Sequence, residues 1–282
     1  MSNLTSLKST IKLNSGHSIP CLHLGVYEVS SRDTYTSVSS ALNLGYRAID
    51  SAEWYGNEAA AGRAIRDFCD KTGTKREEVW FTTKLKSNSG YEATKRAIKR
   101  SLQECGLGYI DLYLIHSPYG GKKQRLESWK AMEEAVGEGV IRSIGVSNYG
   151  VSHLRELLAM KPQIPPGINQ IEVHPFNTRV DITSFCAQHG IVIQAYAPLA
   201  KAMRFSHPVL KTIASKVGKT PAQVLVRWSL EKGYVPLPKS VREARMKENA
   251  DVFGWGLEEE DVKALDGCDE YLVTDWDPTN AD

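Results

Sequence analysis

Cysteine is scarce in this chain of 282 residues, and its few copies are scattered. The five cysteines lie far apart and include no CxxC spacing; they are Cys21, Cys69, Cys105, Cys186 and Cys268. An odd, scattered set argues against a disulfide framework and against a structural zinc site. We therefore expect a protein of a reducing compartment.

The sequence also lacks membrane, export and polyanion-binding signals. No apolar run is long enough to span a bilayer, and residues 1–5 lack the charged start and apolar core of a signal peptide. The formal net charge is only +2, which gives no reason to expect a polyanionic partner. The sequence thus predicts a cytoplasmic protein that binds neither membranes nor nucleic acid.

The common nucleotide-binding fingerprints are missing as well. Two Gly-x-Gly pairs, Gly106-Leu107-Gly108 and Gly137-Glu138-Gly139, have no third glycine at the Rossmann spacing and follow predicted helices, not strands. They are better explained as helix ends and turns. The Walker A pattern does not occur either. A nucleotide cofactor would have to bind by another route.

What the chain does contain is a regular alternation of strand-like and helix-like runs, typical of βαβ units. Eight short, nearly continuous apolar runs predict strands buried on both faces: Leu22–Gly25, Arg47–Asp50, Val79–Lys84, Ile110–His116, Ile141–Val146, Ile168–Val173, Ile191–Tyr196 and Val235–Lys239. The length fits one (β/α)8 TIM barrel of about 250 residues. We predict a single α/β domain over residues 1–282, with an N-terminal β-hairpin cap over residues 10–20 and a short C-terminal tail from Glu270.

Polar residues end three consecutive predicted strands. Asp50, Lys84 and His116 each stand at such an end, and Tyr55 follows Asp50 by five residues. Each alone has an ordinary explanation: a capping Asp, a solvated Lys, a core His, a surface Tyr. Together they predict an active site, because the loops after the strands carry the chemistry of (β/α)8 enzymes. These four residues are called the tetrad.

The tetrad suggests acid catalysis by a phenol. A free Tyr has a pKa of about 10, and a neighbouring Lys favours the phenolate, so Tyr55 would release a proton more readily near neutral pH. In this interpretation Lys84 supplies the charge and Asp50 holds Lys84 in place. His116 orients a substrate oxygen.

A candidate anion site follows the last predicted strand. Lys239, Ser240, Val241, Arg242 and Arg245 open a helix there. Phosphate sites in such barrels often form after the seventh and eighth strands, where free N–H groups of a helix N-terminus attract anions. Arg242 and Arg245 are equally compatible with ordinary surface charges of a helix.

The motifs around the tetrad resemble those of the aldo-keto reductase superfamily, over nearly the whole chain and in order. The matching blocks are Gly45–Ala52, Tyr55–Glu58 with Gly62, Thr82–Lys84, Asp111–His116, Gly145–Asn148, Asn169-Gln170, and Leu237–Ser240 with Arg245, Glu248 and Asn249. The short segment after His116 is similar to the compact microbial branches. The resemblance implies an NADPH-dependent enzyme (NADPH/NADP+), of the alcohol dehydrogenase or carbonyl reductase type, that acts on a small-molecule aldehyde or ketone.

The resemblance also implies a set of cofactor contacts. In the family, the segment that matches Lys239, Ser240, Val241, Arg242 and Arg245 grips the adenosine 2′-phosphate, and the positions of Glu248 and Asn249 contact the adenine. The positions of Ser147, Asn148 and Gln170 hold the nicotinamide carboxamide, and that of Tyr196 stacks on its ring. Further contacts are expected from Gly25, Val26, Tyr27, Asp50 and Leu199. No metal is expected, because family members use none and His174 offers His116 no partner at ligand spacing.

The substrate pocket departs from the family pattern. Ser117 stands where many relatives have Trp after the catalytic His, and Tyr27 also replaces a Trp. The expected substrate-binding residues are Tyr27, Trp54, Tyr55, His116 and Ser117. The same barrel could instead be a non-catalytic nucleotide-sensing module, which a broken tetrad would favour. A monomer or weak dimer is expected.

Overall fold

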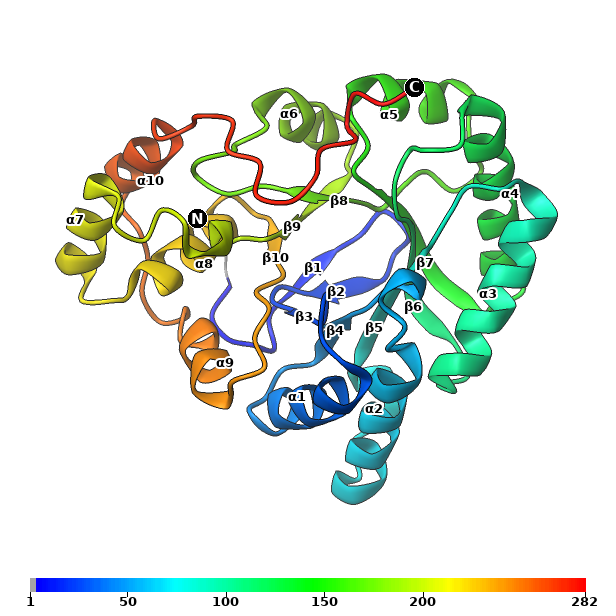
Figure 1. Ribbon diagram of the computed structural model, residues 1–282, viewed down its shortest axis with the longest axis horizontal. Coiled ribbons are helices and arrows are strands. Elements are labelled where there is room, and N and C mark those ends of the chain that lie inside the picture. The colour runs from blue at the N-terminus through cyan, green and yellow to red at the C-terminus, as the bar shows by residue number, and fades with distance from the viewer. Residues whose placement is uncertain (1–3) are drawn as a thin grey trace.

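The computed structural model describes residues 4–282, and a parallel barrel dominates it (Figure 1). Its strands are β3 (Leu24–Gly25), β4 (Ala48–Asp50), β5 (Trp80–Leu85), β6 (Ile110–Ile115), β7 (Ile141–Ser147), β8 (Ile168–Glu172), β9 (Val192–Tyr196) and β10 (Val235–Pro236). Each strand pairs in parallel with its neighbour in chain order. A parallel bridge between Gly25 and Lys239 joins the first strand to the segment after the last. The (β/α)8 prediction is confirmed.

The first and last strands are shorter than the sequence predicts. The sequence predicts a strand over Leu22–Gly25, but β3 covers only Leu24–Gly25. It predicts the last strand over Val235–Lys239, but β10 covers only Val235–Pro236. Pro236 and Pro238 lack the N–H that a ladder requires, so regular pairing stops. Their carbonyls still accept from the backbone N–H groups of His23 and Gly25, at 3.2 and 3.3 Å. These hydrogen bonds therefore close the barrel although regular strand pairing does not continue there.

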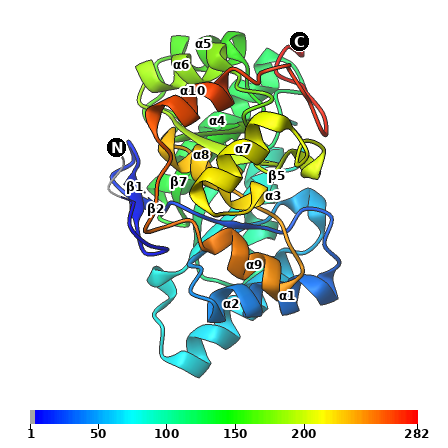
Figure 2. The ribbon, with the colours of Figure 1, turned by 90° about the vertical axis from the view of Figure 1, so that its left-hand side faces the viewer.

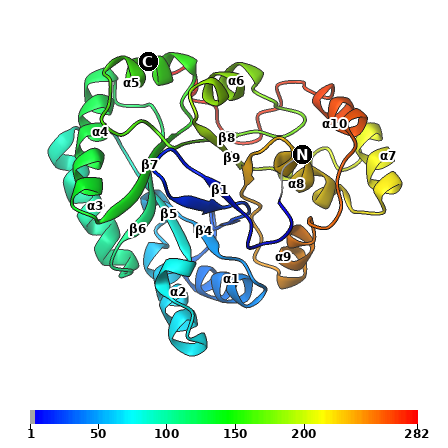
Figure 3. The ribbon, with the colours of Figure 1, turned by 180° about the vertical axis from the view of Figure 1, so that it is seen from behind.

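The predicted N-terminal hairpin is present. Strand β1 (Thr10–Lys12) pairs antiparallel with β2 (Ser18–Pro20) and crosses the barrel mouth in the view from behind (Figure 3). The turn between them contains Gly16 at a φ of 85°, a left-handed conformation that glycine adopts without strain. The Asn14 amide donates to the Pro166 carbonyl at 2.9 Å, which ties the hairpin to the barrel. The hairpin thus closes the end of the barrel opposite the strand C-termini.

Helices cover the outside of the sheet, with α7, α9 and α10 along one flank (Figure 2). The α-helices are α1 (Ser31–Asn43), α2 (Glu58–Thr72), α3 (Tyr91–Cys105), α4 (Lys122–Gly137), α5 (Val151–Ala159), α6 (Val180–Gln188), α7 (Pro208–Val217), α8 (Pro221–Glu231), α9 (Glu243–Ala250) and α10 (Glu259–Asp266). Short 3-10 helices are η1 (Glu53–Tyr55), η2 (Arg76–Glu78) and η3 (Ala200–Ala202). None of the helices within residues 4–282 is both long enough and apolar enough to cross a membrane.

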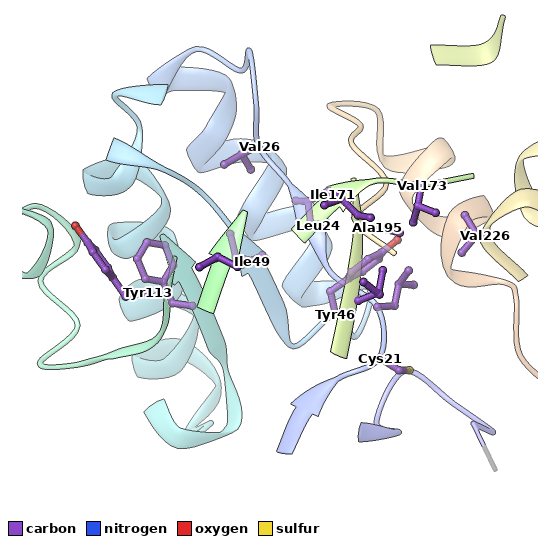
Figure 4. Close-up of a cluster of buried hydrophobic side chains, with 14 of the residues drawn as sticks. Cys21, Leu24, Val26, Tyr46, Ile49, Tyr113, Ile171, Val173, Ala195 and Val226 are labelled. Carbon is purple, nitrogen blue, oxygen red and sulfur yellow. The ribbon is translucent and has the colours of Figure 1, made fainter. Parts of the chain in front are cut away.

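Consecutive side chains of β4 and β6 alternate between two apolar layers, as a pleated strand requires. Ile49 and Tyr113 belong to the larger layer between sheet and helices (Figure 4), whereas Ala48 and Leu112 fill the barrel interior. The hairpin residue Ile19 joins the interior layer. The interior is therefore apolar at the hairpin end, and the tetrad carboxylate and ammonium lie at the opposite strand ends.

Candidate active site

The tetrad converges at the carboxyl ends of β4, β5 and β6. Asp50 is the last residue of β4, Lys84 lies near the end of β5, and His116 directly follows β6. Tyr55 closes the 3-10 helix η1. The Lys84 ammonium donates to Asp50 Oδ1 at 2.5 Å and to the Tyr55 hydroxyl at 3.4 Å. Asp50, Lys84 and Tyr55 thus form one hydrogen-bonded cluster.

Lys84 is fully buried, and all three of its donors have acceptors. Its third hydrogen bond goes to the Ser51 carbonyl at 2.8 Å. Burial lowers the pKa of Lys84 and raises the pKa of Asp50, while the charge of each residue opposes the shift of the other. The Gln170 amide donates to Asp50 Oδ2 at 2.8 Å, which also favours the carboxylate. Gln170, Asp50, Lys84 and Tyr55 therefore form a continuous polar chain.

The protonation of Tyr55 differs from the sequence-based interpretation. Burial raises the pKa of Tyr55 well above its ordinary value, and the negative charge of Asp50 raises it further. The expectation that Tyr55 releases its proton more readily than a free tyrosine is therefore wrong. The Lys84 ammonium lies closer to Asp50 than to the phenol, so its charge does not offset the effect of burial on the pKa of Tyr55. Tyr55 keeps its proton at neutral pH.

His116 is neutral at neutral pH. Burial lowers its pKa to about 3, and the positive charge of Lys84 contributes to the same shift. Its ring centroid lies 5.6 Å from that of Tyr55, and both side chains line one cavity of about 1010 Å³. A neutral imidazole can donate one hydrogen bond but carries no extra proton to release. Within the tetrad, the phenol is therefore the proton donor best suited to an oxygen in the cavity.

The cavity brings together most of the residues that the resemblance assigns to a cofactor. Those that line it are Gly25, Tyr27, Asp50, Ser147, Asn148, Gln170, Tyr196, Leu199, Lys239, Ser240, Arg245, Glu248 and Asn249. They supply two cations, Lys239 and Arg245, and several amide groups. Arg245 lies in the first turn of α9. This donor set fits a nucleotide with phosphates at one end and a carboxamide at the other.

Three predicted cofactor residues do not line the cavity. Val26 is fully buried in the apolar core (Figure 4), and its backbone N–H and carbonyl are bonded to Asp50 and Asn57. Val241 is exposed, and Arg242 is the N-terminal cap residue of α9, outside the cavity. The structure thus places Val26 in the core and the other two at the surface beside the cavity.

The substrate end also departs from the sequence prediction. Tyr27, Trp54, Tyr55 and His116 line the cavity as expected, but Ser117 does not. Ser117 is buried, and its carbonyl accepts a hydrogen bond from the Asn88 amide at 2.8 Å. Another part of the chain places a bulky aromatic side chain next to His116.

Trp276 of the C-terminal tail is that aromatic, and sequence reasoning missed it. Its ring lies 6.2 Å from His116, 6.3 Å from Trp54 and 5.9 Å from Tyr119, between ring centroids. The only signal in the sequence was a tryptophan between two aspartates in a polar tail. Together Trp54, Tyr119 and Trp276 form an aromatic wall around His116.

The tail is fastened across the carboxyl face of the barrel (Figure 1, red). Thr274 donates from its backbone N–H and its hydroxyl to the buried Glu172. Asp275 pairs with Lys201 at 3.2 Å, and the Ala281 carbonyl lies 2.7 Å from the His153 ring. These contacts fix the position of Trp276 between them.

Comparisons with known proteins agree with this geometry. A family model described as the aldo/keto reductase family matches residues 22–270. An uncharacterized oxidoreductase of Schizosaccharomyces pombe is 48% identical over 272 residues, 96% of this chain and 98% of the relative. A glyoxal reductase of Bacillus subtilis is 41% identical over 268 residues, 94% of this chain and 95% of the relative. The solved structure of an aldo-keto reductase from a Medee basin deep-sea metagenome library matches with a TM-score of 0.88 at 39% identity, covering 93% of this chain and 95% of that one.

Proposed function

The chain belongs to the aldo/keto reductase family, and from that premise we propose that it reduces an aldehyde or ketone to an alcohol with NADPH, Tyr55 being the proton donor. The observation that carries the proposal is the hydrogen-bonded set of Asp50, Lys84 and Tyr55 beside a neutral His116, with Asp50, Tyr55 and His116 lining one cavity. A broken tetrad would favour a non-catalytic nucleotide-sensing role, and this tetrad is complete.

Each tetrad residue has a defined part in this reaction. NADPH, when bound, would supply the hydride for the carbonyl carbon. Tyr55 gives its proton to the carbonyl oxygen, and the neutral His116 donates a hydrogen bond to the same oxygen. Lys84 stabilises the phenolate as the proton leaves, and Asp50 keeps Lys84 in place. Gln170 in turn holds Asp50.

The test of the proposed reaction is NADPH consumption, followed by absorbance, with a panel of aldehydes, ketoacids, sugars, diketones and lactones. Glyoxal belongs in the panel because of the Bacillus subtilis relative. We expect turnover of at least one simple aldehyde with NADPH. Binding of NADPH without turnover of any carbonyl compound would favour the nucleotide-sensing role instead.

The pH dependence should differ between the two directions. Carbonyl reduction at saturating cofactor should be constant from about pH 6 to pH 9, because Tyr55 stays protonated beyond its ordinary pKa of about 10. His116 stays neutral over the same range, since its pKa is about 3. Alcohol oxidation requires the phenolate as base and should therefore rise with pH. Initial rates in both directions across this range test this, and a reduction rate that falls through neutral pH would contradict it.

Arg245 should select NADPH over NADH. Arg245 and Lys239 line the cavity, and a charge-assisted hydrogen bond to a phosphate is roughly twice as strong as a neutral one. Arg245→Ala should weaken NADPH binding by about tenfold and leave NADH binding nearly unchanged. Dissociation constants from fluorescence titration measure both cofactors.

Arg242→Ala is the matched control for Arg245→Ala. It removes an arginine three residues away that lies outside the cavity, so it should change neither dissociation constant appreciably. Equal affinity of the unmodified protein for NADPH and NADH would contradict the proposed cofactor preference.

A further inference from the structure

Buried side chains hold three successive carbonyls of the segment after His116. The Asn88 amide donates to the Ser117 and Tyr119 carbonyls, each at 2.8 Å. The Arg125 guanidinium donates to the Pro118 carbonyl between them at 2.7 Å. Asn88 is 7% exposed and Arg125 5% exposed. The backbone of residues 117–119 is therefore fixed from two sides.

Close packing adds to these bonds. Gly120 has a φ of 110°, and a Cβ atom there would lie 2.6 Å from the Asn88 carbonyl oxygen. No larger residue fits without moving the chain at residue 88. Arg125 also pairs with Glu156 at 3.0 Å and donates to the Asp282 carbonyl at 3.0 Å. The same guanidinium thus joins this segment to the end of the C-terminal tail.

The segment carries one side chain toward the aromatic wall. Tyr119 is 51% exposed, and its ring lies 5.9 Å from that of Trp276 at an interplanar angle of 36°. Trp276 lines the cavity, whereas Asn88 does not. Tyr119 does not line the cavity either, so Asn88 would act on a substrate through residues 117–119 and the contact of Tyr119 with Trp276.

We propose that Asn88 is a positioning residue that sets the preference of the pocket for flat aromatic carbonyl substrates. By holding the backbone of residues 117–119, it keeps Tyr119 against Trp276 and keeps the wall rigid. An aromatic substrate gains from a fixed ring surface. A small aliphatic aldehyde reaches Tyr55 and His116 without the wall and gains little. This inference rests on the proposed carbonyl reduction.

The test compares Asn88→Ala with the unmodified protein on 2-naphthaldehyde and on propanal, both with NADPH. We expect the KM for 2-naphthaldehyde to rise by about tenfold, with kcat and the KM for propanal little changed. Asn14→Ala is the control. It removes a similar amide-to-carbonyl bond, 2.9 Å long, at the hairpin end of the barrel, and should alter neither KM.

Tyr119→Ala separates a positioning role from a merely structural one. This half-exposed residue can be truncated with little risk to folding, and its loss should reproduce the selective rise in KM. Combining it with Asn88→Ala should add little, because both changes remove the same wall contact. The inference is overturned if either single variant affects both aldehydes alike, or if their effects on 2-naphthaldehyde multiply. If the unmodified protein reduces neither aldehyde, this inference fails. The proposed function fails only if no carbonyl compound of the wider panel is reduced.

Discussion

Tyr55→Phe should lower the rate of carbonyl reduction by about 100-fold or more and leave the affinity for NADPH unchanged. The substitution keeps the ring and removes only the acidic hydroxyl, and general acid catalysis is worth about 10² to 10⁴ in rate. His116 cannot replace the donor, because its low pKa of about 3 leaves no extra proton at neutral pH. Steady-state rates with a simple aldehyde, together with a fluorescence titration of NADPH, give both quantities.

Tyr27→Phe is the matched control. Tyr27 lines the same cavity, and its ring lies 5.1 Å from that of Tyr55. Of these two tyrosines, Tyr55 is the one that accepts a hydrogen bond from Lys84. Loss of the Tyr27 hydroxyl should therefore change the rate by a few-fold at most. Equal losses in the two variants would mean that the hydroxyl of Tyr55 has no special role.

Lys84→Met should reduce the rate nearly as much, because no cation would then stabilise the phenolate as the proton leaves. Since the residues act as a unit, Tyr55→Phe combined with Lys84→Met should be little worse than either change alone. If the rate losses of the two single variants multiply in the double variant, Asp50, Lys84 and Tyr55 do not act as a unit.

Stability provides a control for this variant. Lys84→Met leaves the buried Asp50 without its cation, and breaking a buried pair from one side costs about 3 to 5 kcal/mol. Adding Asp50→Asn removes the unpaired carboxylate and should restore much of the melting temperature, but not the rate. Recovery of the rate would show that Lys84→Met had acted only by destabilising the fold.

The positions of the tetrad could be predicted because they follow from local patterns. The apolar runs in the sequence end at Asp50, Lys84 and His116. The strands β4, β5 and β6 end at these residues or within one residue of them. Parallel strands in one barrel bring these ends to one face. Pro236 and Pro238 also indicate in the sequence that the last strand is short.

Other features depend on distances that no local pattern encodes. Trp276 reaches the pocket because a polar tail is fastened to distant residues such as Glu172 and His153. The pKa of Tyr55 depends on whether Lys84 lies closer to the phenol or to Asp50, and these distances differ by less than 1 Å. Arg242 and Arg245 look alike in the sequence, but only Arg245 lines the cavity.

The most direct test of the central claim is single-turnover hydride transfer. Protein saturated with NADPH is mixed rapidly with a simple aldehyde, and the loss of reduced nicotinamide is followed by absorbance in the unmodified protein and in Tyr55→Phe. We expect a fast phase in the unmodified protein and a phase slower by about 100-fold or more in Tyr55→Phe. The amount of bound cofactor should be the same in both. Near-normal transfer in Tyr55→Phe at intact cofactor affinity would show that the proton comes from another group, and the proposed mechanism would be wrong.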